Sequence, residues 1–232
     1  MKESKLAVVL SCEHGGNDIP KHYASLFEKD KNVLRTHRGY DIGALDLFKC
    51  FKNGQVVYSQ FATTSRLVVD INRSLHRKSL FSEFTKALPA PEKANILREI
   101  YYAFRNPFKQ KVYSFWEQDR TVLHLSVHSF TPELNGAIRQ TDFGILYHPG
   151  RPREKHFAKV WKSKIEKVLP GFRTRFNYPF QGKPDGHVRY FRDIEREKYL
   201  GIEFEMNQKY AGDKSICEKL GVAFKQAIET FS

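Results

Sequence analysis

The 232 residues, of which 41% are hydrophobic, suffice for a folded core, but no apolar run approaches the ~20 residues that a membrane-spanning helix requires. The N-terminus has no signal-peptide pattern, and Cys12, Cys50 and Cys217 are too few and too scattered for a disulfide framework or a thiolate zinc site, so we expect a cytoplasmic protein. The net charge of +13 attracts anions, but the basic residues form no dense block, which favours a small anionic substrate over specific nucleic-acid binding.

The first predicted element is a strand over residues 5–12, which is apolar on both faces, as in a central parallel strand. Residues 13–20 follow it directly, with two glycines that allow a sharp turn and a proline that suits the start of a helix. His14 therefore lies at the carboxyl end of a strand, where the sheets of α/β proteins bind ligands. The alternative is a plain strand–turn–helix connection in which Asn17 or Asp18 caps the helix.

The next informative segment, residues 65–72, predicts another strand or an extended segment, which delivers Asn72 and Arg73 at its end. A planar guanidinium fork beside an amide suits the bidentate capture of a carboxylate. The alternative is a surface Arg73 that pairs with Asp70.

Residues 123–130 alternate aliphatic side chains with His124, Ser126 and His128. A period of two predicts a strand in which these three polar side chains share a face. His128 then stands where the strand gives way to a loop, just as His14 does. The alternative for any single His is a hydrogen-bonded structural residue.

Residues 200–207 predict a strand with apolar side chains on one face and Glu203, Glu205 and Asn207 on the other. Two carboxylates on one face of a strand lie roughly 6.6–7 Å apart at Cα. Burying both is costly unless a metal or an Arg compensates their charge. The alternative is an amphipathic edge strand with a solvated acidic face.

The other segments predict further alternation of strands and helices. They are a helix that opens at 37–43 with Asp41 as its N-cap, a strand at 55–61, a helix at 91–118 that Pro107 splits, strands at 142–147 and 171–177, a helix at 152–168, a lid or specificity loop at 178–186, and a helix at 214–231. Without repeats or linkers, the alternation predicts one α/β domain over residues 1–232.

His14 has possible oxygen ligands a few residues away, and the second histidine, His128, follows much later in the sequence. Catalytic zinc sites commonly combine such a short and a long spacing between their ligands. Two His and one oxygen ligand leave a fourth position for water. A carboxylate from another strand, Glu203 or Glu205, would then act as the general base on that water.

Four segments occur in order over residues 7–210: Cys12 to Pro20, Tyr40 to Ala44, Ser65 to Arg73, and His128 to Pro132. Together they resemble the N-formylglutamate amidohydrolase family, and Glu203 to Asn207 is similar to the C-terminal strand of that family. The resemblance implies a fold similar to zinc carboxypeptidases and aspartoacylase, with a mixed, mostly parallel sheet between helices. It also implies metal-assisted hydrolysis of the amide bond of an acidic N-acyl amino acid such as N-formylglutamate.

The resemblance also implies roles for individual residues. His14 and His128 become ligands of one divalent metal, which we expect to be zinc. Glu205 becomes the general base, and Arg66 stabilises the oxyanion. From the order of the two carboxylates along their strand, we expect Glu203 to lie deeper and to pair with an Arg. The substrate-binding residues are Asn72, Arg73, Ser129 and Arg139, of which the Asn-Arg pair matches the one that holds the substrate carboxylate in the wider group.

One position departs from the carboxypeptidase-like pattern His-x-x-Glu, because Asn17 stands where the Glu is expected. We expect Asn17 to be the third metal ligand, with Glu13 and Asp18 as alternatives. An amide binds zinc more weakly than a carboxylate does. The alternative functions are therefore a non-catalytic member that binds a carboxylate ligand without turnover, and a basic nucleic-acid-binding protein.

Overall fold

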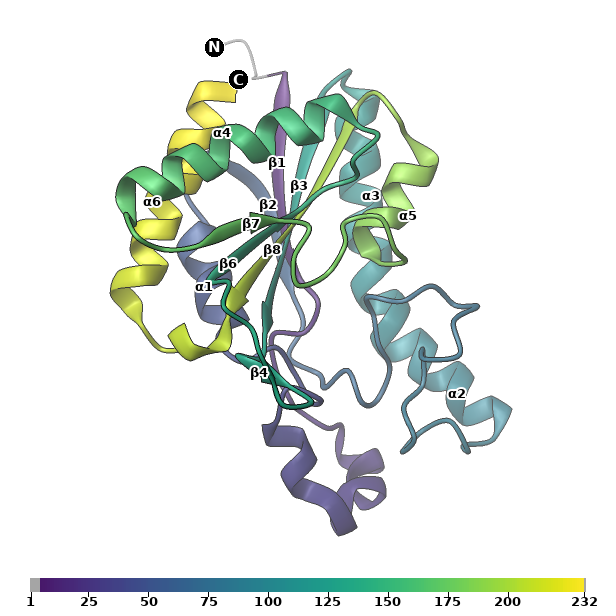
Figure 1. The fold of residues 1–232 in the computed structure, drawn as a ribbon. Helices are drawn as coiled ribbons and strands as arrows, with labels where there is room; N and C mark the ends of the chain where they lie inside the picture. The colour runs from purple at the N-terminus through teal and green to yellow at the C-terminus, as the bar shows by residue number, and fades with distance from the viewer. Residues whose placement is uncertain (1–4, 232) are drawn as a thin grey trace.

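The computed structural model describes residues 5–231 and is built around a six-stranded sheet with the strand order β2-β1-β3-β8-β6-β7 (Figure 1). Its strands are β1 (Leu6–Cys12), β2 (Val56–Phe61), β3 (Thr121–Phe130), β6 (Phe143–Leu146), β7 (Thr174–Phe176) and β8 (Tyr199–Asn207), while β4 (Glu133–Leu134) and β5 (Ala137–Ile138) form a separate hairpin. The strands β2, β1, β3 and β8 are parallel, and β6 runs antiparallel to β8. The predicted single α/β domain with a mixed, mostly parallel sheet is confirmed.

Helices cover both faces of this sheet (Figure 1). The α-helices are α1 (Ala44–Phe51), α2 (Ala90–Ile96), α3 (Ala103–Glu117), α4 (Pro152–Val168), α5 (His187–Ile194) and α6 (Lys214–Phe231). There are also two 3-10 helices among the described residues, η1 (Lys21–Arg35) and η3 (Gln208–Tyr210), and a π-helix, η2 (Leu97–Tyr102). Helices α1, α4 and α6 pack on one face, and α3 and α5 on the other. Within residues 5–231, no helix is both long enough and apolar enough to cross a bilayer.

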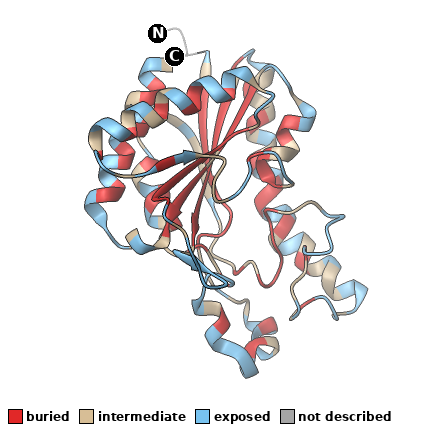
Figure 2. Cartoon of the chain, in the orientation of Figure 1, coloured by how far each residue is buried: buried red, intermediate tan, exposed pale blue. Residues whose placement is uncertain are grey.

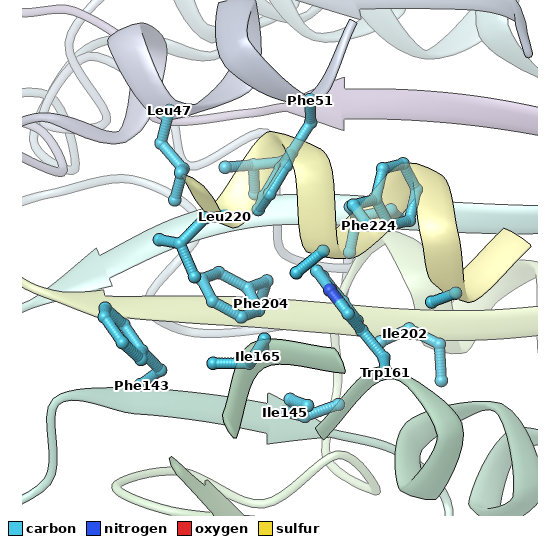
Figure 3. Packing of buried hydrophobic residues seen from close by; sticks show 14 of the residues in the cluster. Leu47, Phe51, Phe143, Ile145, Trp161, Ile165, Ile202, Phe204, Leu220 and Phe224 are labelled. Atoms are coloured by element: carbon cyan, nitrogen blue, oxygen red, sulfur yellow. The ribbon is translucent and has the colours of Figure 1, made fainter. Parts of the chain in front are cut away.

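An aromatic cluster holds α1, α4 and α6 against the sheet (Figure 3). The Trp161 ring of α4 lies 4.7 Å from the Phe204 ring of β8 and 5.0 Å from the Phe224 ring of α6, between ring centroids, and Phe51 of α1 contacts all three. Such pairs contribute about 0.5–1.5 kcal/mol each beyond the burial of their surface. The cluster therefore fixes β8, whose opposite face carries Glu203 and Glu205.

The three central strands are mostly buried, as their red colour in Figure 2 shows, and yet their opposite face carries polar side chains. Because side chains alternate along a strand, one set of residues of β1, β3 and β8 faces the aromatic cluster, and the alternate set faces α3 and α5. The second set includes the polar residues of these strands beside the apolar Ala7, Val9 and Val122. These polar residues are the buried Ser11, His124, Ser126, His128 and Glu205 and the partly buried Glu203, and the buried Glu13 follows β1 directly. The predicted common face of His124, Ser126 and His128 is confirmed.

The chain order creates a crevice between β1 and β3. From β1 the chain first visits β2 on one side and then returns to β3 on the other side. The helices that follow two such neighbouring strands pack on opposite faces of the sheet. This creates a space at the carboxyl ends of the two strands, where ligands bind in open α/β sheets. His14 follows β1, and His128 lies near the end of β3, so both histidines flank this crevice.

The glycines after β1 serve a close approach of two backbone segments. A Cβ on Gly16 would lie 2.5 Å from the carbonyl oxygen of Thr63, and one on Gly15 would lie 2.9 Å from that of Ala62. The adjoining backbone also forms a bridge between Asp18 and Thr64. Only glycine allows the turn after β1 to pack this tightly against the segment that follows β2.

The prediction of a strand or an extended segment at residues 65–72 is wrong, because this segment folds as successive turns. Its apolar residues Val68, Val69 and Ile71 are buried in a separate cluster with Phe27 of η1, which explains their pattern. Their backbone groups bond to turns instead of a strand, as in the hydrogen bond from the Asp70 N–H to the Leu80 carbonyl oxygen at 2.8 Å.

The predicted break at Pro107 is also wrong, because Pro107 lies inside α3. The helical path runs from residue 90 to residue 117, and the π-helical turn η2 widens it just before α3. A proline lacks the N–H that would bond four residues back and crowds that carbonyl group. The wider turn relieves this crowding without ending the helix.

Candidate active site

His14, Asp41 and His128 converge from three separate segments at the β1–β3 crevice. One ligand atom from each lies within 4.8 Å of the other two. Asp41 Oδ2 is 3.5 Å from His14 Nδ1 and 2.8 Å from His128 Nδ1. The Asp41 backbone N–H donates to the His14 carbonyl oxygen at 2.9 Å, which brings the loop before α1 against the end of β1.

The other ring nitrogen of each histidine is held by a hydrogen bond. His14 Nε2 donates to Asp70 Oδ1 at 2.7 Å. His128 Nε2 donates to Ser126 Oγ at 2.8 Å, and Ser126 in turn donates to Glu13 Oε2 at 2.7 Å. Histidines that bind metals commonly donate their second N–H in this way, which fixes the tautomer and aims the free nitrogen at the ion.

The charges around His128 favour a cation at this point. Although burial lowers it, the hydrogen bond and charge of Asp41 raise the pKa of His128 to about 10. Burial opposes ionisation of Asp41, but His14, His128 and Arg66 hold the pKa of its carboxyl group far below its usual range. A proton on His128 Nδ1 therefore occupies the position that a metal ion would take between the ring and Asp41.

The residues present fit a divalent metal. His14 Nδ1 is buried and makes no hydrogen bond, so this nitrogen carries a lone pair that lacks a partner. A tetrahedral ion with bonds of about 2.0–2.1 Å separates its ligand atoms by roughly 3.3–3.4 Å. The 3.5 Å between His14 Nδ1 and Asp41 Oδ2 is close to this value, and two imidazoles with one carboxylate form a donor set typical of catalytic zinc.

Asn17 is not brought to this cluster. Its amide nitrogen donates to the Leu34 carbonyl oxygen at 2.9 Å, near the end of η1, and the carboxylate beside the two histidines belongs to Asp41. Of the alternatives, Glu13 bonds to His187 and Ser126 and lies 3.5 Å from Nε2 of His128, the nitrogen that faces away from Asp41. The prediction of Asn17 as the third ligand therefore gives way to Asp41, which the sequence suggested only as a helix cap.

Asp41 does not cap α1. The N-cap residue is Gly43, whose φ of 82° lies in the left-handed region, and a Cβ there would also lie 2.9 Å from the Ala211 side chain. Asp41 contributes only its backbone carbonyl to this turn, through the hydrogen bond from the Ala44 N–H at 3.0 Å. Its carboxylate is therefore free to face His128.

Glu203 and Glu205 both project into the same cavity, which has a volume of about 480 Å³. Glu205 lies opposite His128 in the β3–β8 pairing and is 5% exposed, with Oε2 making no hydrogen bond. Burial raises the pKa of Glu205 to about 8, with a further contribution from the negative charge of Asp41. Glu203 lies opposite Ser126, and its side chain is more exposed than that of Glu205. Within residues 5–231 no ion pair includes Glu203, so the expected Arg partner is not found, although burial raises its pKa and Arg192 is the positive charge that most opposes this rise.

Asp41 and Asp70, the carboxylates that contact the two histidines, also contact Arg66 and Arg73 of the cavity. Arg66 donates from one nitrogen to Asp41 Oδ1 at 3.2 Å and from another to Asp70 Oδ2 at 3.0 Å. Arg73 lies 3.8 Å from Asp70 and donates to the Asp185 carbonyl oxygen at 3.2 Å. Arg66 and Arg73 are thus oriented before any ligand arrives, and both line the cavity.

Asn72 bridges the histidine cluster and helix α5. Its amide oxygen accepts from the His187 backbone N–H at 2.7 Å, and its amide nitrogen lies 3.4 Å from His128 Nε2. The amide oxygen is therefore occupied, which leaves the amide nitrogen as the donor that can face a ligand.

Ser129 and Arg139, which were predicted to bind substrate, both line the cavity. Ser129 Oγ donates to the Ile42 carbonyl oxygen at 2.8 Å and accepts from the Gln208 side-chain amide at 3.1 Å. Arg139 follows the β4–β5 hairpin, and its guanidinium group lies 5.5 Å from the centre of the Phe180 ring. The hairpin thereby contacts the loop at residues 178–186, which was predicted to cover the site.

The family model described as N-formylglutamate amidohydrolase matches residues 6–211 of the chain. No curated protein sequence is significantly similar to it.

Solved structures share the fold. The structure of gene product Atu2144 from Agrobacterium tumefaciens matches with a TM-score of 0.79 and 22% identity, over 96% of this chain and 90% of that one. The N-formylglutamate amidohydrolase from Ralstonia eutropha JMP134 matches with a TM-score of 0.73 and 15% identity, over 99% and 95% of the two chains. A putative carboxypeptidase A from Shewanella denitrificans OS-217 also matches, with a TM-score of 0.47 and 13% identity, over 97% and 57%.

Proposed function

The chain belongs to the N-formylglutamate amidohydrolase family, which makes it a hydrolase of amide bonds, and on this premise we propose that it hydrolyses an acidic N-acyl amino acid such as N-formylglutamate with the help of one zinc ion. The proposed metal ligands are His14, Asp41 and His128. The observation that carries the proposal is their convergence, through two Nδ1 atoms and one carboxylate, in the cavity that Glu205 also lines.

A divalent cation bound there acts as a Lewis acid, which makes water acidic and polarises the carbonyl group of the substrate. Glu205 accepts the proton of the attacking water and delivers it to the amine that leaves. A general base needs the carboxylate form. Arg66 and a nearby cation both favour that form, against the burial that now raises the pKa of Glu205.

Arg66 holds a position between Asp41 and Asp70 from which its remaining N–H groups stabilise the negative charge that develops on the carbonyl oxygen. Arg73 and Arg139 offer two separated guanidinium groups for the two carboxylates of the substrate, assisted by Asn72 and Ser129. The positive charge of the chain then serves a small dianion.

A non-catalytic ligand-binding member was suggested because Asn17 is a poor zinc ligand. Asp41 supplies a carboxylate in place of that amide, so no observation now favours this alternative.

The proposal is tested with protein loaded with zinc and a matched pair of substrates, N-formylglutamate and N-formylglutamine. A charged hydrogen bond contributes about 1.5–3 kcal/mol, so kcat/KM should be roughly 10–100-fold higher for the acid. Arg139→Gln should remove most of that preference and leave turnover of the amide substrate nearly unchanged. Protein that holds its zinc but hydrolyses neither compound, nor any other N-acyl amino acid, contradicts the proposed function.

A further inference from the structure

A second cavity is lined by residues of helices α3 and α5, which lie on the right-hand side of Figure 1. Its volume is about 430 Å³, within the range of small-molecule sites. It shares no wall residue with the active-site cavity. Its walls come from residues 74–76, η2, α3 and α5.

Arg105 is a buried cation of this cavity without a carboxylate partner. It is 7% exposed, and its guanidinium carbon lies 5.3 Å and 5.1 Å from the ring centres of Tyr101 and Tyr190. Its hydrogen bond goes to the Ile71 carbonyl oxygen at 3.3 Å, and within residues 5–231 no ion pair includes it. No Asp or Glu of the described chain lines the cavity, and Lys109 adds another positive charge. A buried charge of this kind is costly unless an anion compensates it.

His187, which is also among the residues that line this cavity, has an unused hydrogen-bond acceptor. The residue is fully buried, its Nδ1–H donates to Glu13 Oε1 at 2.7 Å, and its Nε2 makes no hydrogen bond. Burial and the nearby charge of Arg105 lower the pKa of His187 to about 4, so at neutral pH Nε2 carries a lone pair. A ligand that satisfies this atom must donate an O–H or N–H.

The remaining walls are apolar and aromatic, with Leu75, Tyr102 and Phe191 among them. We propose that this cavity is a second binding site for a small carboxylate that has an aromatic or aliphatic body and a hydroxyl or N–H group next to the carboxylate. The carboxylate pairs with Arg105, the neighbouring donor bonds to His187 Nε2, and the body packs on the aromatic walls.

Phenylacetate and mandelate test this assignment, because they differ only by the hydroxyl group next to the carboxylate. Binding is measured by calorimetry on the full chain, in an Arg73→Gln background that weakens carboxylate binding in the active-site cavity. Mandelate should bind about 3–10-fold more tightly than phenylacetate, as expected for one net hydrogen bond. Benzyl alcohol, which lacks the charge, should not bind measurably.

Two substitutions separate the two contacts. Arg105→Gln should weaken both acids by roughly 10–100-fold. His187→Asn retains a side-chain N–H that can reach Glu13 but removes Nε2, so it should make the two acids bind equally. Arg98→Gln, on the exposed part of the same helical segment, is the matched control and should change neither affinity.

The assignment is overturned if Arg105→Gln, shown to be folded by circular dichroism, binds both acids as the parent does. It is also overturned if neither acid binds the parent protein at millimolar concentration, or if the ratio of the two affinities is the same in His187→Asn. None of these results depends on turnover, so they are independent of the proposed function.

Discussion

Glu205→Gln should change how the stability of the metal-free protein depends on pH. Burial raises the pKa of Glu205 to about 8, whereas a Glu in the unfolded chain ionises near pH 4.3–4.5. Between these values the folded state keeps a proton that the unfolded state has lost, so the free energy of unfolding falls as pH rises. Below about pH 4.5 this effect is absent, and above about pH 8 it is complete.

The magnitude follows from the separation of the two pKa values. At about 1.36 kcal/mol per pH unit, a change from roughly 4.4 to about 8 corresponds to roughly 3–5 kcal/mol. Glutamine has a similar shape and does not ionise. The variant should therefore gain this amount relative to the wild type between pH 4.5 and pH 9, whatever slope the other groups impose on both proteins.

The assay is urea unfolding of both proteins at several pH values in the presence of a chelator. Glu166→Gln, on the exposed face of α4, is the control and should follow the wild type at every pH. Saturating zinc should shrink the gain of Glu205→Gln, because a nearby cation favours the carboxylate. Parallel stability curves for wild type and Glu205→Gln would refute the inference that Glu205 is a buried, protonated side chain.

With zinc bound, Glu205→Gln should lower turnover by about 10²–10⁴ while the metal content stays the same, and Glu203→Gln should keep most of the turnover because it is not opposite His128; steady-state kinetics with metal analysis decide between them. Asn17→Ala should cost about 1 kcal/mol in urea unfolding, since it loses one hydrogen bond, and a loss of bound zinc in that variant would count against the site as described. Phe51→Ala should cost about 3–5 kcal/mol, because the ring is fully buried among three aromatic neighbours, and a cost below 1 kcal/mol would mean that the cluster is loosely packed.

The parts of the fold that could be predicted are those where periodicity and local chemistry agree. Helices α4 and α6 have the predicted bounds, β1 lies where the continuous apolar run predicted it, and β3 and β8 lie where alternation predicted them. Because parallel strands end at the same edge of the sheet, the meeting of His14 and His128 followed from their positions alone. Residues 65–72 were wrongly predicted, since a short run of apolar residues can also fill a small core beneath successive turns.

The third candidate metal ligand could not be predicted from local sequence. Asp41 has the spacing of a helix cap, and only the long-range hydrogen bond from its N–H to the His14 carbonyl oxygen brings it to the histidines. The one signal for it was the resemblance of residues 40–44 to the family. Asn17 has the expected position in the sequence, but its amide is used at the end of η1. His187 gave no signal, because its partner Glu13 is distant in sequence.

The most direct test of the candidate active site is metal analysis of purified Asp41→Asn beside the wild type and Asn17→Ala, with circular dichroism to show that each is folded. Wild type and Asn17→Ala should each bind about one zinc per chain, and Asp41→Asn should bind at least 10-fold more weakly, because an amide replaces the shared carboxylate ligand. Undiminished zinc binding by Asp41→Asn, together with its loss in Asn17→Ala, would contradict this account of the site.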